Sequence, residues 1–290
     1  MFRRVLIANR GEIALRVIRA CHALGAEAIA VYSEADRQSP HLEAADHTVC
    51  IGPGPSGQSY LNADAILEAA IMMDAQAIHP GFGFLSENAL FAKRCEQQKL
   101  AFVGPRASSI RMMGDKATAR RVMREAGLPV MPGSKEVLED VDEARERAEE
   151  LGYPVLLKAT AGGGGKGMRR CDDPSQLAAA FKDASREAEK AFGNPDLYME
   201  KYIIGGRHIE FQVLADHYGN VIHLGERECS VQRNHQKLIE EAPATNFSEE
   251  TRQQLGETIR EAVRAVGYRN AGTIEFLMDH TGQLYFMEMN

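Results

Sequence analysis

A run of glycines framed by two lysines is the part of this sequence best suited to bind a ligand. Residues 155–170 read VLLKATAGGGGKGMRR. Four consecutive glycines cost conformational entropy on folding, so we expect their backbone N–H groups to approach a ligand, most often phosphate oxygens. Lys158 and Lys166 supply positive charge for the same anion. Gly167 stands where a Walker A loop carries Ser or Thr, which excludes that motif and leaves a flexible linker as the alternative.

Two acidic residues near position 290 form a second candidate site. A hairpin with a two-residue loop at Thr281-Gly282 would set Glu275 opposite Glu288, and any even-length loop keeps both on one face. Two carboxylates this close repel each other unless a cation lies between them, and Mg²⁺ that also holds phosphates is the natural candidate. The alternative is a solvated polar face. The same face should carry Thr273 and Asn290, and the apolar face Ile274, Phe276, Met278, Tyr285, Met287 and Met289.

Two polar segments complete the set of candidates. Residues 79–88 (HPGFGFLSEN) follow an expected strand, which places them at the carboxyl end of a sheet, where ligands bind in α/β folds. A structural turn at Pro80-Gly81 explains them equally well. Residues 227–237 (RECSVQRNHQK) gather Gln, His and cations in one stretch.

The elements that must position these segments alternate between strand and helix in residues 1–113. We expect strands at 5–8, 28–32, 48–51, 77–78 and 101–103, and helices at 12–24, 62–73 and 89–98. This order predicts a Rossmann-like parallel sheet. The first turn contains only Gly11, which disfavours a dinucleotide site.

The remaining residues predict a small α/β subdomain followed by a mostly β region. In residues 114–203 we expect helices at 116–126, 142–151 and 174–191, with strands at 155–158 and 197–202. In residues 204–290 we expect strands at 208–214, 221–226, 272–278 and 283–290, with one helix between Ser248 and Gly267.

Composition excludes several classes of function. The chain has 290 residues, of which 44% are hydrophobic and 26% charged, as in an ordinary globular protein. A net charge of -7 argues against nucleic acid as a partner, and no apolar stretch approaches the ~20 residues of a membrane span. Five scattered cysteines without a Cys-x-x-Cys pair indicate neither a disulfide framework nor a zinc site. With no secretory start visible, we expect a cytoplasmic protein.

The motifs together resemble biotin carboxylase, a member of the ATP-grasp superfamily. The resemblance rests on residues 9–14, 79–88, 162–168, 198–202, 227–237 and 288–290, in the family's order along the whole chain. It implies an α/β fold with a Rossmann-like pre-ATP-grasp domain (1–113), an ATP-grasp lid subdomain (114–203) and an incomplete core sheet (204–290). Within the family, the chain looks most like the subunit of acetyl-CoA carboxylase, which acts in fatty acid biosynthesis. Pyruvate and acyl-CoA carboxylase domains share these motifs.

The resemblance also implies roles for individual residues, with ATP, Mg²⁺ or Mn²⁺ and carrier-bound biotin as the small molecules. Phe82 replaces an expected tyrosine and removes one hydroxyl from the presumed biotin approach. Lys237 and His235 are the implied catalytic residues, and Lys237 would hold bicarbonate. The implied nucleotide contacts are Lys116, Lys158, Gly164, Gly165, Glu200, Lys201, Tyr202, Ile203, His208, Gln232, His235, Glu275 and Glu288, and the implied metal ligands are Glu275, Glu288 and Asn290.

The family continues past the position of Asn290, with a general base and arginines that this chain does not contain. We therefore expect the chain to be the first two thirds of such an enzyme, to bind nucleotide weakly and not to carboxylate biotin as it stands. The implied partners are bicarbonate, a biotin carboxyl carrier protein, carboxyltransferase subunits and, at full length, a second copy, but neither nucleic acid nor membrane. A carboxylate-amine ligase and a non-catalytic nucleotide-binding module are the alternatives.

Overall fold

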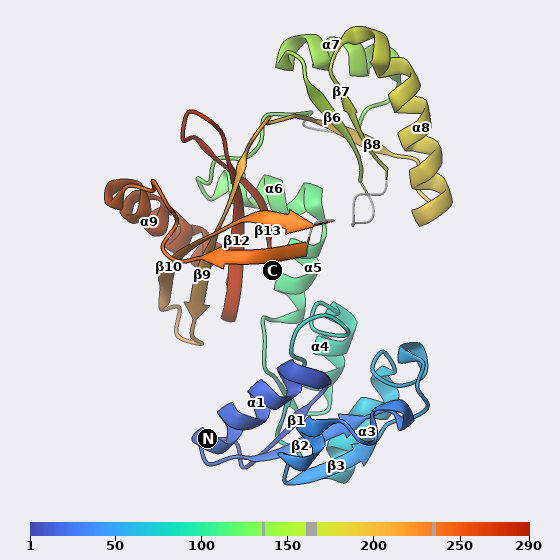
Figure 1. Ribbon diagram of the computed structural model, residues 1–290, viewed down its shortest axis with the longest axis vertical. Helices are drawn as coiled ribbons and strands as arrows, with labels where there is room; N and C mark the ends of the chain where they lie inside the picture. Colours follow the sequence, from blue (N-terminus) through green and yellow to red (C-terminus); the bar gives the residue numbers. More distant parts are fainter. Residues whose placement is uncertain (135–136, 161–166, 234–235) are drawn as a thin grey trace. The chain divides into compact units, whose positions relative to one another are not determined.

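The computed structural model in Figure 1 describes residues 1–134, 137–160, 167–233 and 236–290. The chain divides into two compact units, each taken by itself below. The first comprises Met1–Gly114, Ala215–Asn220 and Gly267–Ala271, and the second comprises Asp115–Leu214, Val221–Val266 and Gly272–Asn290.

The first unit is built on a five-stranded sheet in which every neighbouring pair is parallel. The strand order is β3-β2-β1-β4-β5, so the order reverses beside β1, as in Rossmann-like folds. The predicted parallel sheet is therefore confirmed. The strands are β1 (Arg4–Ile7), β2 (Glu27–Tyr32), β3 (His47–Cys50), β4 (Ala77–His79) and β5 (Ala101–Phe102).

The core of the first unit forms on both faces of its sheet because side chains alternate along each strand. On β1, Ile7 packs into one apolar cluster with Ile18 of the first helix, while Leu6 packs into another with Ile66 of the third. The helices are α1 (Gly11–Ala23), α2 (Pro40–Glu43), α3 (Ala63–Met72), α4 (Ala89–Gln97) and α5 (Ala107–Gly114), with short 3₁₀ helices η1 (Glu34–Asp36) and η2 (Ser56–Gln58).

The second unit contains a three-stranded antiparallel sheet that carries Lys158. Its order is β7-β6-β8, from β6 (Val155–Ala159), β7 (Met168–Cys171) and β8 (Leu197–Lys201). Helices α7 (Val141–Leu151) and α8 (Pro174–Phe192) are capped by Asp140 and Asp173, whose side chains accept hydrogen bonds from backbone N–H groups of the first turn. Both helices contribute to the apolar cluster on this sheet. Figure 1 shows the two helices beside its strands.

A second five-stranded sheet, of order β11-β10-β9-β12-β13, completes this unit. Phe276 is fully buried at its centre and meets the rings of Phe211 and Phe286 edge-on, with centroids 6.2 and 6.5 Å away. The elements are β9 (Arg207–Ala215), β10 (Val221–Arg233), β11 (Gln236–Glu241), β12 (Asn270–Met278) and β13 (Leu284–Met289), with helices α6 (Lys116–Glu125) and α9 (Glu249–Ala265).

The hairpin of β12 and β13 closes differently from the prediction. The backbone N–H of Asp279 donates to the carbonyl of Gln283, 2.9 Å away, so three residues close the turn instead of two. A register shift next to Glu275 compensates for the odd loop length, and Glu275 does pair with Glu288. The predicted pairing of the two acids is confirmed.

The same register shift corrects the face assigned to Tyr285. Tyr285 pairs with Leu277, which was not predicted on the apolar face of the hairpin. Phe286 pairs instead with Phe276, which was predicted on that face. An irregular register moves every side chain between the bulge and the turn to the opposite face. The prediction that Tyr285 lies on the apolar face was wrong.

Three elements lack the sequence signals that would have predicted them. Helix α5 spans only eight residues, and strand β7 contains two arginines among its four residues. Strand β11 is mostly exposed at the sheet edge and is charged, so it shows no alternation of apolar and polar residues.

Candidate nucleotide and bicarbonate site

Strand β6 presents Lys158 on the polar face of the three-stranded sheet. Val155, Leu157 and Ala159 alternate with it and are buried. The Nζ atom of Lys158 donates to Glu200 on β8. The lysine predicted to meet phosphate is therefore ion-paired with the carboxylate predicted to border adenine.

Other predicted nucleotide contacts differ in how free their side chains are. Lys201 donates to the carbonyls of Gly152 and Tyr153, at 2.8 and 3.0 Å, which commits its ammonium group to the backbone. The guanidinium of Arg170 stacks on the ring of Tyr202 at 4.5 Å. Lys116 is the first residue of α6 and, like Ile203, is partly exposed. Gly164, Gly165 and His235 lie outside the described residues.

Glu275 on β12 is the centre of a second cluster. Lys237 Nζ and Asn290 Nδ2 donate to its Oε1 at 2.7 and 2.9 Å, and His208 Nε2 lies 3.1 Å from its Oε2. Burial alone would raise the pKa of Glu275, but His208 and Lys237 outweigh it and lower the pKa to about 2. Glu275 is therefore ionised at neutral pH, as a metal ligand must be.

Lys237 is a permanent cation at this site. Burial alone lowers its pKa, but its pairing with Glu210 and Glu275 outweighs burial and raises the pKa above the ordinary value. A lysine of this kind holds an anion and does not act as a general base. Arg227 completes the pairing of Glu210, with its Nε 2.7 Å from the second carboxylate oxygen.

His208 is oriented by Gln232, whose Nε2 lies 2.6 Å from His208 Nδ1. Gln232 is itself fixed, because it also donates to the carbonyl of Cys229 at 2.9 Å. The thiol of Cys229 is buried, and burial is the main cause that raises its pKa to about 12. A neutral thiol is a poor nucleophile, so we assign no chemical role to Cys229.

The residues around Glu275 and Glu288 fit a divalent cation. Four carboxylates, from Glu210, Glu240, Glu275 and Glu288, accompany two cations, Arg227 and Lys237, in this part of the described residues. No ion pair is found for Glu288 within the described ranges, and the donors are hard oxygens of the kind Mg²⁺ prefers. Glu275, Glu288 and the amide of Asn290 are the residues that would hold it.

Sequence reasoning missed Glu210 and Arg120. Glu210 could have been found, because His208, Glu210 and Gln212 alternate on β9 with the buried Ile209, Phe211 and Val213. Arg120 gave no such signal. It lies on a charged helix and reaches Glu200, 80 positions further along the chain, at 2.7 Å.

In the first unit, residues 79–88 begin at His79, the last residue of β4, and continue at the carboxyl end of the parallel sheet. The side-chain amide of Asn9 donates to the carbonyls of Pro80 and Phe82, at 2.8 and 2.7 Å, and fixes the start of this segment. The ring of Phe82 remains 62% exposed. Burial lowers the pKa of His79, which keeps the imidazole neutral at neutral pH.

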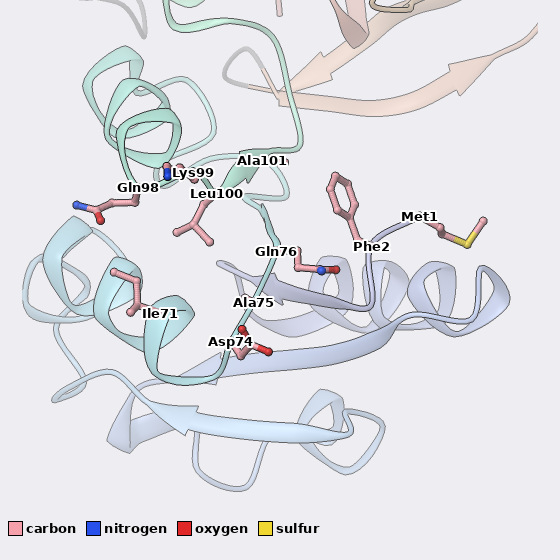
Figure 2. Close-up of a pocket in the computed structure, with 10 residues that line it drawn as sticks. All are labelled: Met1, Phe2, Ile71, Asp74, Ala75, Gln76, Gln98, Lys99, Leu100 and Ala101. Carbon is pink, nitrogen blue, oxygen red and sulfur yellow. The ribbon is translucent and has the colours of Figure 1, made fainter.

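Figure 2 shows a surface pocket at the other end of this sheet. Its lining includes Phe2 before β1, Gln76 before β4 and Leu100 before β5, so it lies at the amino ends of the strands. Ligands of open α/β sheets bind beyond the carboxyl ends. We therefore do not assign the nucleotide to this pocket.

Two family models match this chain in succession. Residues 1–110 match the family described as biotin carboxylase, N-terminal domain, and residues 115–290 match the carbamoyl-phosphate synthase L chain, ATP binding domain. The chain belongs to the biotin carboxylase family. Biotin carboxylase 1 of Bacillus subtilis is 54% identical over the whole chain, which covers 65% of that relative. Biotin carboxylase of a Nostoc species is 53% identical, with the same coverage.

Solved biotin carboxylase structures have the same fold. A biotin carboxylase from Campylobacter jejuni, in complex with β,γ-ATP, superimposes with a TM-score of 0.95 at 51% identity, over 100% of this chain and 65% of that one. A second structure is the biotin carboxylase domain dimer of Hydrogenobacter thermophilus 2-oxoglutarate carboxylase, in complex with MgADP, ADP and bicarbonate. It superimposes with a TM-score of 0.93 at 52% identity, over 100% of this chain and 64% of that one. The chain spans 65% of the length of the two curated relatives named above. None of its described helices is long and apolar enough to cross a membrane.

Proposed function

We propose that this chain binds MgATP and bicarbonate as the ATP-dependent part of a biotin carboxylase. The observation that carries the proposal is the position of Lys237, a half-buried cation 2.7 Å from Glu275, which in turn pairs with Glu288. An anion-binding cation beside two candidate metal ligands suits the joining of a phosphate donor and a small carboxylate. The β,γ-ATP, MgADP and bicarbonate named for the two similar structures support this proposal.

The proposed reaction has two steps. The terminal phosphoryl group of ATP passes to a bicarbonate oxygen, which gives ADP and carboxyphosphate. Carboxyphosphate then releases phosphate and CO₂. The CO₂ forms a bond to N1 of biotin, and the proton of N1 passes to the released phosphate. When bound, Mg²⁺ or Mn²⁺ neutralises the phosphate charge.

Each residue has a defined task in this proposal. Lys158 leaves Glu200 and contacts phosphate, together with Lys116. Lys237 holds bicarbonate by charge, and Glu275 and Glu288 hold the metal. The adenine lies beside residues 200–203.

We further propose that the biotin is attached to a carrier protein, that carboxyltransferase subunits use the product, and that acetyl-CoA is its final acceptor. The relatives named as biotin carboxylases support this assignment. The 2-oxoglutarate carboxylase small subunit, at 52% identity, and methylcrotonoyl-CoA carboxylase, also at 52%, support other acceptors equally well.

A second candidate function is phosphorylation of bicarbonate for attack by ammonia. It is favoured by one observation, the match of residues 115–290 to the ATP-binding domain of carbamoyl-phosphate synthase. Both functions begin with bicarbonate and differ in the group that accepts the carbon.

The test measures binding first and turnover second. In calorimetry with MgADP present, bicarbonate should bind wild type, and a chloride control should give no heat beyond dilution. ATP hydrolysis with bicarbonate is measured on this chain and on a version extended to the length of the curated relatives. Biotin should raise the rate of the extended version, and ammonium should not. Stimulation by ammonium alone would establish the second candidate. Absence of a bicarbonate effect on either measurement would contradict both.

A further inference from the structure

Glu200 is held by two cations of different exposure. Lys158 Nζ donates to its Oε2, and Arg120 Nη1 lies 2.7 Å from its Oε1. The side chains of Arg120 and Glu200 are 9% and 8% exposed, whereas that of Lys158 is 21% exposed. The site therefore has an inner ion pair and an outer lysine that reaches toward solvent.

Several elements fix the inner pair. Arg120 extends from α6, donates from Nη2 to the carbonyl of Met131 at 2.7 Å and lies 5.5 Å from the ring centre of Tyr198 on β8. The backbone of Glu200 forms a β-bridge with Gly133. Both members of the pair are therefore held in place from two directions, independently of Lys158.

The Nε atom of Arg120 lowers the stability of the fold. This buried atom has no hydrogen-bond partner among the described residues. A buried donor without a partner is destabilising, and replacing a buried ion pair with apolar residues is often neutral or favourable. Helix α6 could have been anchored more simply by an apolar side chain at this position.

We infer that Arg120 is a positioning residue for nucleotide binding, an inference that rests on the proposed function. When Lys158 leaves Glu200 for a phosphate, Arg120 keeps the buried carboxylate paired. Without Arg120, Lys158 would be the only cation on Glu200, and its departure would strand a buried charge. Arg120 thus reduces the cost of freeing Lys158.

The test compares affinities for MgATP and for adenosine, which lacks the phosphates. Arg120→Gln should weaken MgATP binding about tenfold to a hundredfold, the size of one charge-assisted contact, and adenosine binding by less than about threefold. Arg120→Lys keeps the charge and should remain within about fivefold of wild type for both ligands. Arg121→Gln is the matched control, because Arg121 is 61% exposed on the same helix and pairs with Glu125.

The double variant Arg120→Gln/Glu200→Gln separates positioning from structural support. Removing the carboxylate removes the reason to retain Lys158, so the preference for MgATP over adenosine should return to within about threefold of wild type. Glu200→Gln alone should keep or increase that preference. If Arg120→Gln does not fold, as judged by circular dichroism, the Glu200→Gln variant decides the question.

The outcomes separate this inference from the function beneath it. Equal losses for MgATP and adenosine in Arg120→Gln, no recovery in the double variant, or a reduced preference in Glu200→Gln would each overturn the role of Arg120. Wild type that binds adenosine as tightly as MgATP would instead overturn the proposed function.

Discussion

The ammonium group of Lys237 lies 2.7 Å from Oε1 of Glu275, although β10 and β9 separate β11 from β12 in the sheet order. A side chain from the sheet edge therefore reaches the strand that carries the candidate metal ligand. Bicarbonate on Lys237 and a metal on Glu275 would share one site. In the proposed reaction, this proximity would bring a bicarbonate oxygen close to the terminal phosphorus of the nucleotide without a large movement of either residue.

Lys237→Met should abolish bicarbonate binding and leave MgADP affinity within about fivefold of wild type. The anion loses its charge partner, while Glu275 keeps Asn290 and His208. Calorimetry with bicarbonate in the presence of MgADP checks this, with Lys182→Met on the exposed face of α8 as the control. Bicarbonate binding that survives in Lys237→Met would contradict the assignment.

Lys158→Gln should weaken MgATP binding about tenfold to a hundredfold and adenosine binding much less. A charge-assisted hydrogen bond contributes about 1.5 to 3 kcal/mol, and only the phosphates would lose it. Lys182→Gln should leave both affinities unchanged. The phosphate role of Lys158 fails if the two ligands lose affinity equally.

Glu288→Gln should remove most of the metal dependence of nucleotide binding. With Mg²⁺ present, the affinity for ADP should fall about tenfold relative to wild type, and with EDTA in place of Mg²⁺ the two proteins should bind ADP equally. The matched control is Glu257→Gln, since Glu257 is 65% exposed on α9 and pairs with Arg260. A difference that persists in EDTA would show that Glu288 does not act through a metal.

Acid should destabilise the second unit through Glu226. Burial alone would raise the pKa of this carboxyl, but Arg252, with Nε and Nη2 both 2.7 Å away, lowers it below the ordinary 4.5. A lowered folded-state pKa contributes stability above pH 4.5 that is lost as pH falls through the folded value. The free energy of unfolding, measured with urea from pH 7 to pH 3, should show this loss in wild type. Glu226→Gln should reduce the slope of that free energy against pH. If the slope is unchanged in Glu226→Gln, groups other than Glu226 cause the acid sensitivity.

The parts of the site that were predictable are those that follow from local pattern. Lys158 stands out because a lysine interrupts a buried strand before a glycine run, and Glu275 and Glu288 pair because strand side chains alternate. The parallel sheet follows from alternating strands and helices in residues 1–113. Each of these predictions depends on residues that lie close together in the sequence.

The parts that were not predictable depend on distant packing. Arg120 meets Glu200 only after α6 and β8 have come together, and nothing near Arg120 marks it as buried. Tyr285 lies on the face opposite to the predicted one because a bulge next to Glu275 compensates for the three-residue turn. The bulge and the length of the turn both depend on how β13 packs. Edge strand β11 forms by pairing with β10 and not through its own apolar pattern.

In the proposed function, phosphate, metal and bicarbonate meet between Lys158, Glu275 and Lys237. The most direct measurement is a crystal structure of this chain with Mn²⁺ and a non-hydrolysable ATP analogue, using anomalous scattering to locate the metal. We predict a Mn²⁺ peak within about 2.5 Å of carboxylate oxygens of both Glu275 and Glu288, with Lys158 moved from Glu200 to a phosphate. A Mn²⁺ peak elsewhere, or a bound analogue with Lys158 still on Glu200, would contradict the account.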